Sequence, residues 1–297
     1  MKNTFSHLRV SSEYSITQGL LTINQIVDSA VKHSVPSVAL TDKSNMFGLV
    51  KFFNKCEAAG IKPISGSSIK VAFEEDDQPF ELLCLAKNNN GHKNLMKIIT
   101  SAHNNYNYQA PIIDFKDLVD LKDQIVVISG GKDSHIFDLL KRHKVDEAEK
   151  RIDKFLSFFK DDFVLEVQKT HRDNEHEYFT NVIPISSKKG IPIIATNDVL
   201  FAESKDFDTH ETKVCINTSK TLSDPNREKL FSQEQYFKSP EQMESLFDGF
   251  GELISNTNEI SKKCNVSIHT KEYFLPEYPV PKEHDFDSFL VDLSNKR

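Results

Sequence analysis

The sequence predicts an α/β fold built on a mostly parallel sheet, and two features of its 297 residues carry this prediction. Short apolar segments rich in β-branched residues alternate with segments whose apolar residues recur at helical spacing. About seven such strand–helix units follow one another, which favours a (β/α) barrel over an open, doubly wound sheet. The chain is long enough to bury its own core, and no apolar run approaches the roughly 18 residues that a membrane span needs.

Each element is predicted from its local pattern. Strands are expected at residues 5–10, 36–41, 61–71, 80–87, 124–129, 163–168 and 191–196. Helices are expected at residues 22–33, 47–59, 91–103, 133–143, 147–159, 175–188, 207–216, 239–247 and 252–263. Two helix starts carry a capping box, Thr22 with Gln25 and Ser239 with Gln242, and Gly60 is placed to end the helix before it.

The character of the chain changes after Cys264. Pro276, Pro279 and Pro281 lie close together there, and proline at this density excludes a regular helix. We therefore predict a boundary near residue 270, with one domain at residues 1–270 and a linker that begins a second, truncated region at residues 271–297.

Charge and cysteine usage exclude several classes of protein. The 37 Lys and Arg residues against 44 Asp and Glu give a net charge of −7, which argues against a surface devoted mainly to nucleic-acid phosphates but leaves room for local basic patches. The four cysteines show neither a CxxC pair nor zinc-knuckle spacing, so free thiols are expected. Because Met1–Phe5 lead directly into predicted structure without a secretory signal, we expect a cytoplasmic protein.

The candidate site lies where the parallel strands end, because the loops that follow the strands of a barrel converge there. A metal-dependent hydrolase would place His, Asp and Glu at most of these positions. In this sequence Asp42 and Asp198 are the carboxylates, whereas Arg9 and Lys43 bring positive charge. A metal ion beside an arginine and a lysine is electrostatically unfavourable, so the residues themselves predict no metal.

These positions also carry a resemblance to a known family. The motifs are HLRVSSEYS at residues 7–15 with Gly19, ALTD at 39–42 with Asn45 and Gly48, AGIKPI at 59–64 with Gly66, LAKN at 85–88, ISGG at 128–131, ATNDV at 195–199 and FLP at 274–276. Together they resemble, in order and over nearly the whole chain, the N-terminal polymerase-and-histidinol-phosphatase (PHP) domain of the bacterial DNA polymerase III alpha subunit.

The resemblance implies a PHP-type distorted (β/α)7 barrel up to about residue 270, followed by the start of the polymerase core. The parent protein would be a DNA-directed DNA polymerase, a nucleotidyltransferase that uses magnesium at carboxylates outside these residues. The barrel itself would have no catalytic residues and no cofactor, and would act as a scaffold. Its implied partners are the remainder of the alpha subunit and the proofreading exonuclease subunit, with DNA bound through the full polymerase rather than mainly through this domain, and no membrane.

Metal-binding members of that family carry a histidine pair in the first motif, a histidine after Thr-Asp, a glutamate after the Gly-x step and further ligands, at positions that can be matched in this sequence. The matching residues are Arg9, Ser11, Gln18, Lys43, Ser68, Glu81, Thr170, Asp198 and Leu200. Asp198 alone clearly keeps a ligand of the family type, and Glu81 replaces one possible ligand by another. We therefore expect a dismantled metal site in which Arg9 and Lys43 pair with Asp42 and Asp198 in place of the metals.

Two enzymatic alternatives remain open. One is an active metal-dependent PHP phosphoesterase. The other follows from the SGGKDS sequence at residues 129–134, which matches the pyrophosphate loop of ATP pyrophosphatases but is also expected of a tight turn with Asp133 or Ser134 as helix cap. Three histidine-containing segments are assigned ordinary roles: His210 is expected on a helix surface, residues 171–177 in a solvated loop, and His7 as a hydrogen-bonded barrel residue.

Overall fold

A computed structural model of the chain describes residues 5–73, 78–105, 110–269, 273, 275–276 and 278–296. It divides the chain into two units, Met1–Ser267 and Ile268–Arg297. The first unit contains every strand and ten α-helices among the described residues, and the second contains α11 (Phe286–Asn295). Residue 270, where we predict the boundary, and Phe274 of the FLP motif lie outside the described residues.

The first unit is built on a seven-stranded sheet in the order β1-β2-β3-β5-β6-β7, with β4 paired to β2. The strands are β1 (Ser37–Leu40), β2 (Lys62–Ala72), β3 (Phe80–Ala86), β4 (Ile112–Asp114), β5 (Ile125–Ile128), β6 (Phe163–Gln168) and β7 (Ile193–Thr196). The expectation of a mostly parallel sheet needs one correction, because β3 runs antiparallel to both β2 and β5. The physical reason is that the short connection between β2 and β3 has no room for the crossover helix that a parallel pair requires.

The N-terminal segment closes the sheet into a barrel. Residues 7–10 lie between β1 and the chain that follows β7, with parallel bridges from His7 to Val38 and from Val10 to Val199. The Ala39 amide donates to the His7 carbonyl at 2.7 Å, and the Val199 amide donates to the Arg9 carbonyl at 3.2 Å. The strand predicted at residues 5–10 is therefore present as isolated bridges and not as a regular strand.

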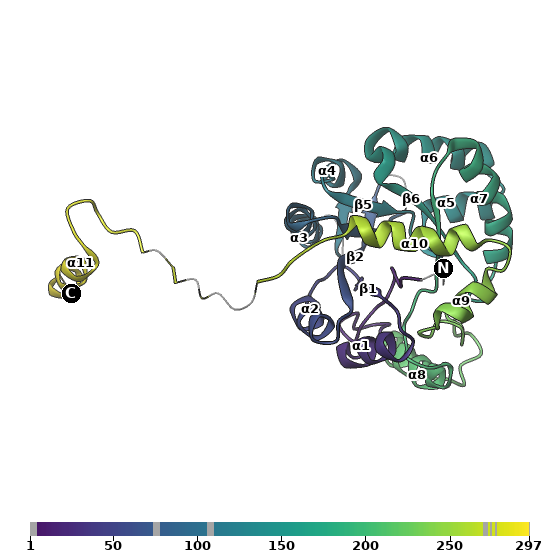
Figure 1. Cartoon of the computed structure of the whole chain (residues 1–297), viewed down its shortest axis with the longest axis horizontal. Coiled ribbons are helices and arrows are strands. Elements are labelled where there is room, and N and C mark those ends of the chain that lie inside the picture. Colours follow the sequence, from purple (N-terminus) through teal and green to yellow (C-terminus); the bar gives the residue numbers. More distant parts are fainter. Residues whose placement is uncertain are drawn as a thin grey trace. The chain divides into compact units, whose positions relative to one another are not determined.

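Helices surround the barrel, and α10 lies across it in the view of Figure 1. They are α1 (Ile23–Lys32), α2 (Leu49–Ala58), α3 (Asn89–Asn104), α4 (Phe115–Asp120), α5 (His135–Lys141), α6 (Val145–Phe159), α7 (Glu175–Lys189), α8 (Phe207–Thr218), α9 (Pro240–Leu246) and α10 (Gly251–Lys263). Both predicted capping boxes are confirmed, at Thr22 and Ser239. The elements β4, α4 and α11 were not predicted from the sequence.

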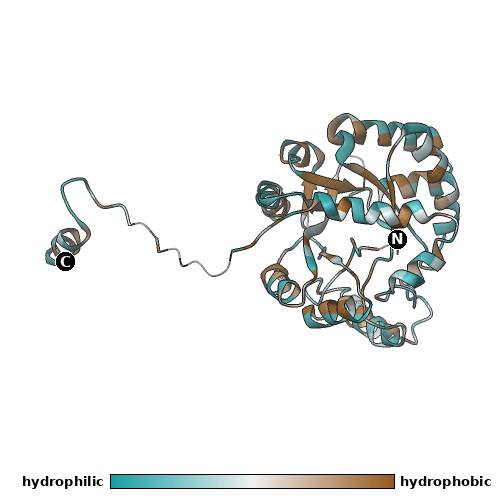
Figure 2. Ribbon diagram, viewed as in Figure 1, coloured by the Kyte–Doolittle hydropathy of each residue, from teal (hydrophilic) through white to brown (hydrophobic). Residues whose placement is uncertain are grey.

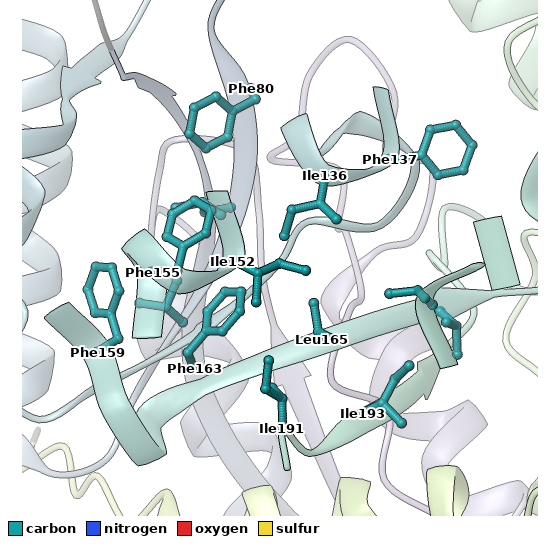
Figure 3. Packing of buried hydrophobic residues seen from close by; sticks show 14 of the residues in the cluster. Phe80, Ile136, Phe137, Ile152, Phe155, Phe159, Phe163, Leu165, Ile191 and Ile193 are labelled. Carbon is teal, nitrogen blue, oxygen red and sulfur yellow. The ribbon is translucent and has the colours of Figure 1, made fainter. Parts of the chain in front are cut away.

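The core has an outer and an inner part. The outer part lies between the strands and the surrounding helices, where Phe155 and Phe163 stack with ring centroids 5.0 Å apart (Figure 3). The inner part contains Leu8 of the N-terminal segment, Ile64 and Ile128 from the strands, and Ile260 of α10. Figure 2 shows the corresponding pattern, with apolar strands inside and polar outer helix faces. No helix among the described residues combines the length and apolar character needed to cross a membrane.

Candidate functional site

Four charged side chains meet at the end of the barrel where the parallel strands finish. Arg9 comes from the N-terminal segment, Lys43 follows β1, and Glu166 lies within β6. Glu81 lies at the start of β3, which belongs to the same end because β3 is antiparallel to its neighbours. The fold thus brings together residues that are more than 150 positions apart in the sequence.

Arg9 lies at the centre of this network. Its Nε and Nη2 donate to the two carboxylate oxygens of Glu166 at 2.8 and 3.0 Å, which is the forked geometry that arginine favours. Its Nη1 donates to Oε1 of Glu81 at 2.6 Å, and the other oxygen of Glu81 lies 3.1 Å from Nζ of Lys43. The side chains of Arg9 and Glu81 are each 4% exposed and that of Glu166 is fully buried.

The electrostatics keep Arg9 and Glu81 ionised despite their burial. Burial disfavours the charged guanidinium, but Glu166, Glu81 and Asp198 outweigh it and raise the pKa of Arg9 well above its usual value. Burial also favours neutral Glu81, yet Lys43 and Arg9 lower the pKa of Glu81 below its usual value. Each charge is therefore stabilised by its opposite, as buried ions require.

A second arginine, Arg172, extends the network toward the surface. It donates through Nη1 to Asp198 at 3.0 Å, through Nε to Glu175 at 3.1 Å and through Nη2 to Gln168 at 2.6 Å. Burial opposes its charge, but Asp198 and Glu175 prevail and raise the pKa of Arg172. The expectation of a solvated loop at residues 171–177 was therefore wrong for Arg172 and Glu175, whose side chains are each 6% exposed.

Asp42 belongs to a different cluster. It accepts hydrogen bonds from the backbone amide of Ser12 and from the hydroxyls of Ser12 and Ser15, all at 2.7 Å. Burial raises the pKa of Asp42, although these hydrogen bonds oppose the shift. Asp42 thus holds the loop after the N-terminal segment.

The expected ion-pair partners consequently differ from the observed ones. Within the described part of the chain, Arg9 pairs with Glu81 and Glu166, and Lys43 pairs with Glu81. Asp198, the other expected partner, pairs with Arg172. The physical reason is the distance between the side chains: Glu81 lies between the two cations and offers one carboxylate oxygen to each of them.

The remaining expected site positions are near this end of the barrel but contribute differently. Thr170 joins the network, since its hydroxyl donates to Glu175 at 2.6 Å and accepts from Arg172 at 2.8 Å. Ser11 and Ser68 make backbone hydrogen bonds that hold adjacent segments. Gln18 lies in the loop that follows Ser12 and Ser15, the two serines that bind Asp42, and Leu200 is a buried apolar residue.

Glu166 is a central residue that the sequence analysis missed. A signal was present, because a carboxylate interrupts the otherwise apolar strand FVLEVQ at residues 163–168. Besides Arg9, it accepts hydrogen bonds from Gln168 and Thr196, and every residue of β6 is buried. A lone charged residue in a strand of this kind requires a buried partner.

The SGGKDS loop forms the tight turn that was one of its two predicted roles. Gly130 and Gly131 have φ angles of +94° and +58°, and Ser134 caps α5 by accepting from the Phe137 amide at 3.1 Å. A Cβ atom on Gly130 would collide with the carbonyl oxygen of Glu81. The glycines therefore allow the backbone to pass close to the charge network.

Two histidines were assigned roles that the structure tests. His7 is buried and hydrogen-bonded through Nε2 to the Lys238 carbonyl at 2.8 Å, which confirms its expected role. His210 is fully buried between the rings of Phe201 and Phe231, so its expected place on a helix surface was wrong. The polar segment after α8 covers it, which helical periodicity alone does not reveal.

The donor set does not fit the metal ions that the resemblance implies for active members. No three His, Cys, Asp or Glu side chains form a metal-binding group within the described ranges. At the centre of the site both oxygens of Glu81 face basic side chains, and both oxygens of Glu166 accept from Arg9. Carboxylates engaged in this way have their lone pairs directed at cations already present.

Comparison with known proteins agrees with the architecture. The PHP domain family matches residues 7–170, more than half of the chain. DNA polymerase III subunit alpha of Pseudomonas aeruginosa is 36% identical over 292 residues, which is 98% of this chain and 25% of the relative. The subunit of the same name from Escherichia coli K12 is 38% identical over 277 residues, 93% of this chain and 24% of the relative.

Among solved structures, an amidohydrolase from Chromobacterium violaceum with bound sulfate and no metal aligns with a TM-score of 0.47 and 12% identity, over 66% of this chain and 88% of that one. The chain spans about a quarter of the length of the curated relatives. Because the family match covers more than half of its residues, the chain belongs to the PHP domain family.

Proposed function

We propose that the chain is the PHP region of a replicative DNA polymerase alpha subunit, and that its barrel is a metal-free, catalytically silent scaffold. The similarity to DNA polymerase III alpha subunits over nearly the whole chain supports the first part. The polymerase reaction, magnesium-dependent nucleotidyl transfer in the cytoplasm, would then belong to the full subunit, of which this chain covers about a quarter.

The observation that carries the second part is the Arg9–Glu81–Lys43 arrangement. Glu81 is one of the residues matched to the family's metal ligands, and its two oxygens lie 2.6 Å from Arg9 and 3.1 Å from Lys43. A divalent cation entering here would have to displace Arg9 or Lys43 or lie beside them, and like charges at such distances repel by several kcal/mol in a partly buried site, about 4 kcal/mol for unit charges 4 Å apart. The network thus takes the place of the metals and stabilises the barrel.

Metal content tests this proposal directly. The chain is purified without chelators, incubated with zinc, manganese and iron, desalted, and measured by elemental mass spectrometry. We expect a stoichiometry near zero and no hydrolysis of p-nitrophenyl phosphate. Two or three tightly held metal ions per chain, with phosphoesterase activity, would show that the barrel is an active metal enzyme instead.

A reverted variant provides the matched control. Arg9→His, Ser11→His, Lys43→His and Ser68→Glu together restore the ligand types that the resemblance implies at these positions. Metal uptake by this variant but not by the wild-type chain would show that the same fold binds metal once the basic residues are gone, and that the assay detects it.

The proposed scaffold also has a partner. We propose that the barrel binds the proofreading exonuclease subunit and packs against the remainder of the alpha subunit. Sedimentation velocity with the exonuclease subunit from the same genome tests the first contact, and we expect a complex of one chain with one exonuclease. A mixture that sediments as two separate species at tens of micromolar would contradict it.

A further inference from the structure

The outer surface of the barrel carries a basic face on α2 and α3. Lys51 and Lys55 lie on α2, Lys93 and Lys97 lie on α3, and all four are exposed. The two helices contain one carboxylate between them, Glu57, although the whole chain has a net charge of −7. None of the four lysines forms an ion pair with any described residue, whereas many other surface lysines do.

The two helices lie on the same side of the sheet and run antiparallel. Both contact β2. The helix α2 connects the parallel strands β1 and β2 and so runs opposite to β2, while α3 follows β3 and ends beside the loop before α2. There Nε2 of His103 lies 2.8 Å from the carbonyl oxygen of Ser44. Each helix therefore carries a row of two exposed lysines, and the two rows run in opposite directions on helices that both contact β2.

The spacing and chemistry of these rows suit a chain of phosphates. Lysines four positions apart are separated by about 6 Å along a helix, close to the separation of successive phosphates along a nucleic-acid strand. Lysine offers a point charge and lacks the forked geometry with which arginine reads guanine, so the expected contact is with the backbone and independent of sequence. The next helix, α4, carries Asp117 and Asp120 beside Lys116, so the basic character ends there.

We propose that the α2–α3 face, Lys51, Lys55, Lys93 and Lys97, binds the phosphate backbone of DNA. The choice of DNA over another polyanion rests on the proposed function of the parent protein. This contact would be an electrostatic guide on the outside of the barrel, separate from the buried charge network and without chemistry of its own.

Fluorescence anisotropy with labelled single-stranded and duplex oligonucleotides tests the proposal on the 297-residue chain. Four phosphate contacts predict a salt slope of about −3.6 for duplex DNA, so affinity should fall about 100-fold between 50 and 200 mM salt. In the variant with all four lysines changed to glutamine, we expect binding at least tenfold weaker at 50 mM salt and a slope near zero.

The matched control changes four other exposed lysines to glutamine: Lys141, Lys150, Lys160 and Lys229. It removes the same number of positive charges from exposed positions, so an effect of net charge alone would weaken both variants equally. We expect the DNA affinity of the control to lie within threefold of that of the wild-type chain. Both variants should keep the circular dichroism spectrum and melting temperature of the wild-type chain, because the changed side chains lie in solvent.

Three results would overturn the proposal: no DNA binding by the wild-type chain at 50 mM salt, equal losses in both variants, or poly-glutamate binding as tightly as DNA with the same sensitivity to the four lysines. The outcome is separable from the proposed function. If the metal content stays near zero while the lysine variant binds DNA normally, only the proposal of a DNA-binding face is refuted. If the chain holds metals and hydrolyses phosphoesters, the proposal of a catalytically silent barrel is refuted, whatever the anisotropy measurement gives.

Discussion

Replacing Arg9 by methionine tests the charge network most sharply. The substitution keeps the approximate length of the side chain but removes the cation that faces Glu81 and Glu166. Glu81 retains Lys43 at 3.1 Å, whereas Glu166 loses both of its forked bonds and stays fully buried. Removing one partner of a buried ion pair costs about 3–5 kcal/mol because the other charge is left uncompensated. We expect a decrease of this size in the free energy of unfolding.

Two further variants separate charge from packing. Arg9→Lys keeps the charge but loses the fork to Glu166, so we expect a smaller cost of about 1–3 kcal/mol. In the double variant Arg9→Met with Glu166→Met, both buried charges are gone, and we expect it to be more stable than Arg9→Met alone. The recovery of stability should be incomplete, because Gln168 and Thr196 also donate to Glu166 and would lose their acceptor.

Urea unfolding followed by circular dichroism at neutral pH measures these three variants and, for the test of additivity, Glu166→Met alone. The reasoning would be refuted by a cost below about 1 kcal/mol for Arg9→Met, which is the range of exposed ion pairs. It would also be refuted if Glu166→Met added its full cost to that of Arg9→Met, since independent sites add and coupled ones do not.

Three other predictions concern metal binding, His7 and two glycines. Adding EDTA, zinc or manganese should leave the melting temperature unchanged in a thermal shift assay, whereas a metal site filled at 100 times its Kd would contribute about 2.7 kcal/mol. Lowering the pH from 6.5 to 4 should destabilise the chain by up to about 3 kcal/mol, because burial lowers the pKa of His7 to about 4 and the unfolded chain takes up the proton first. In His7→Gln, the urea midpoint should fall less over this pH range. If the dependence of the midpoint on pH were the same in the variant, the assignment to His7 would be contradicted. Gly130→Ala should lower the free energy of unfolding by about 1–3 kcal/mol or more, since its Cβ would meet the Glu81 carbonyl and its φ is +94°. Gly60→Ala, at a φ of +70° with open space around it, should lower it by only about 1 kcal/mol. Equal decreases would show that the close approach at Gly130 is unimportant.

The regular elements were predictable because their signals are local. The strand at residues 163–168 and the capping box at Thr22 depend on neighbouring residues alone, and both are found as predicted. Closure of the barrel was harder to see, because the pairing of residues 7–10 with Val38 and Val199 joins segments nearly 190 positions apart. The direction of β3 follows from a connection length, which is visible in the sequence but was not used.

Part of the composition of the site was predictable, but its pairing was not. Arg9, Lys43 and Asp198 were identified from where strands end, yet Asp198 is held by Arg172. A polar segment such as residues 171–177 is expected to be exposed to solvent. Only the fold shows that the side chain of Arg172 points inward to Asp198 and Gln168. Pairing depends on side-chain reach between distant segments, which periodicity and spacing do not encode.

The position of Arg9 links the charge network to the way the barrel closes. The N-terminal segment joins its neighbours through isolated bridges and individual backbone hydrogen bonds, without forming a regular strand. Arg9 lies on this segment and binds Glu81 of β3 and Glu166 of β6, so its side chain connects the closing segment to strands across the barrel. A metal ion held between the same elements would provide a similar link only while bound, and its contribution would depend on the free metal concentration. A guanidinium attached to the chain provides that link permanently, which suits a barrel whose proposed task is to hold its shape for other proteins.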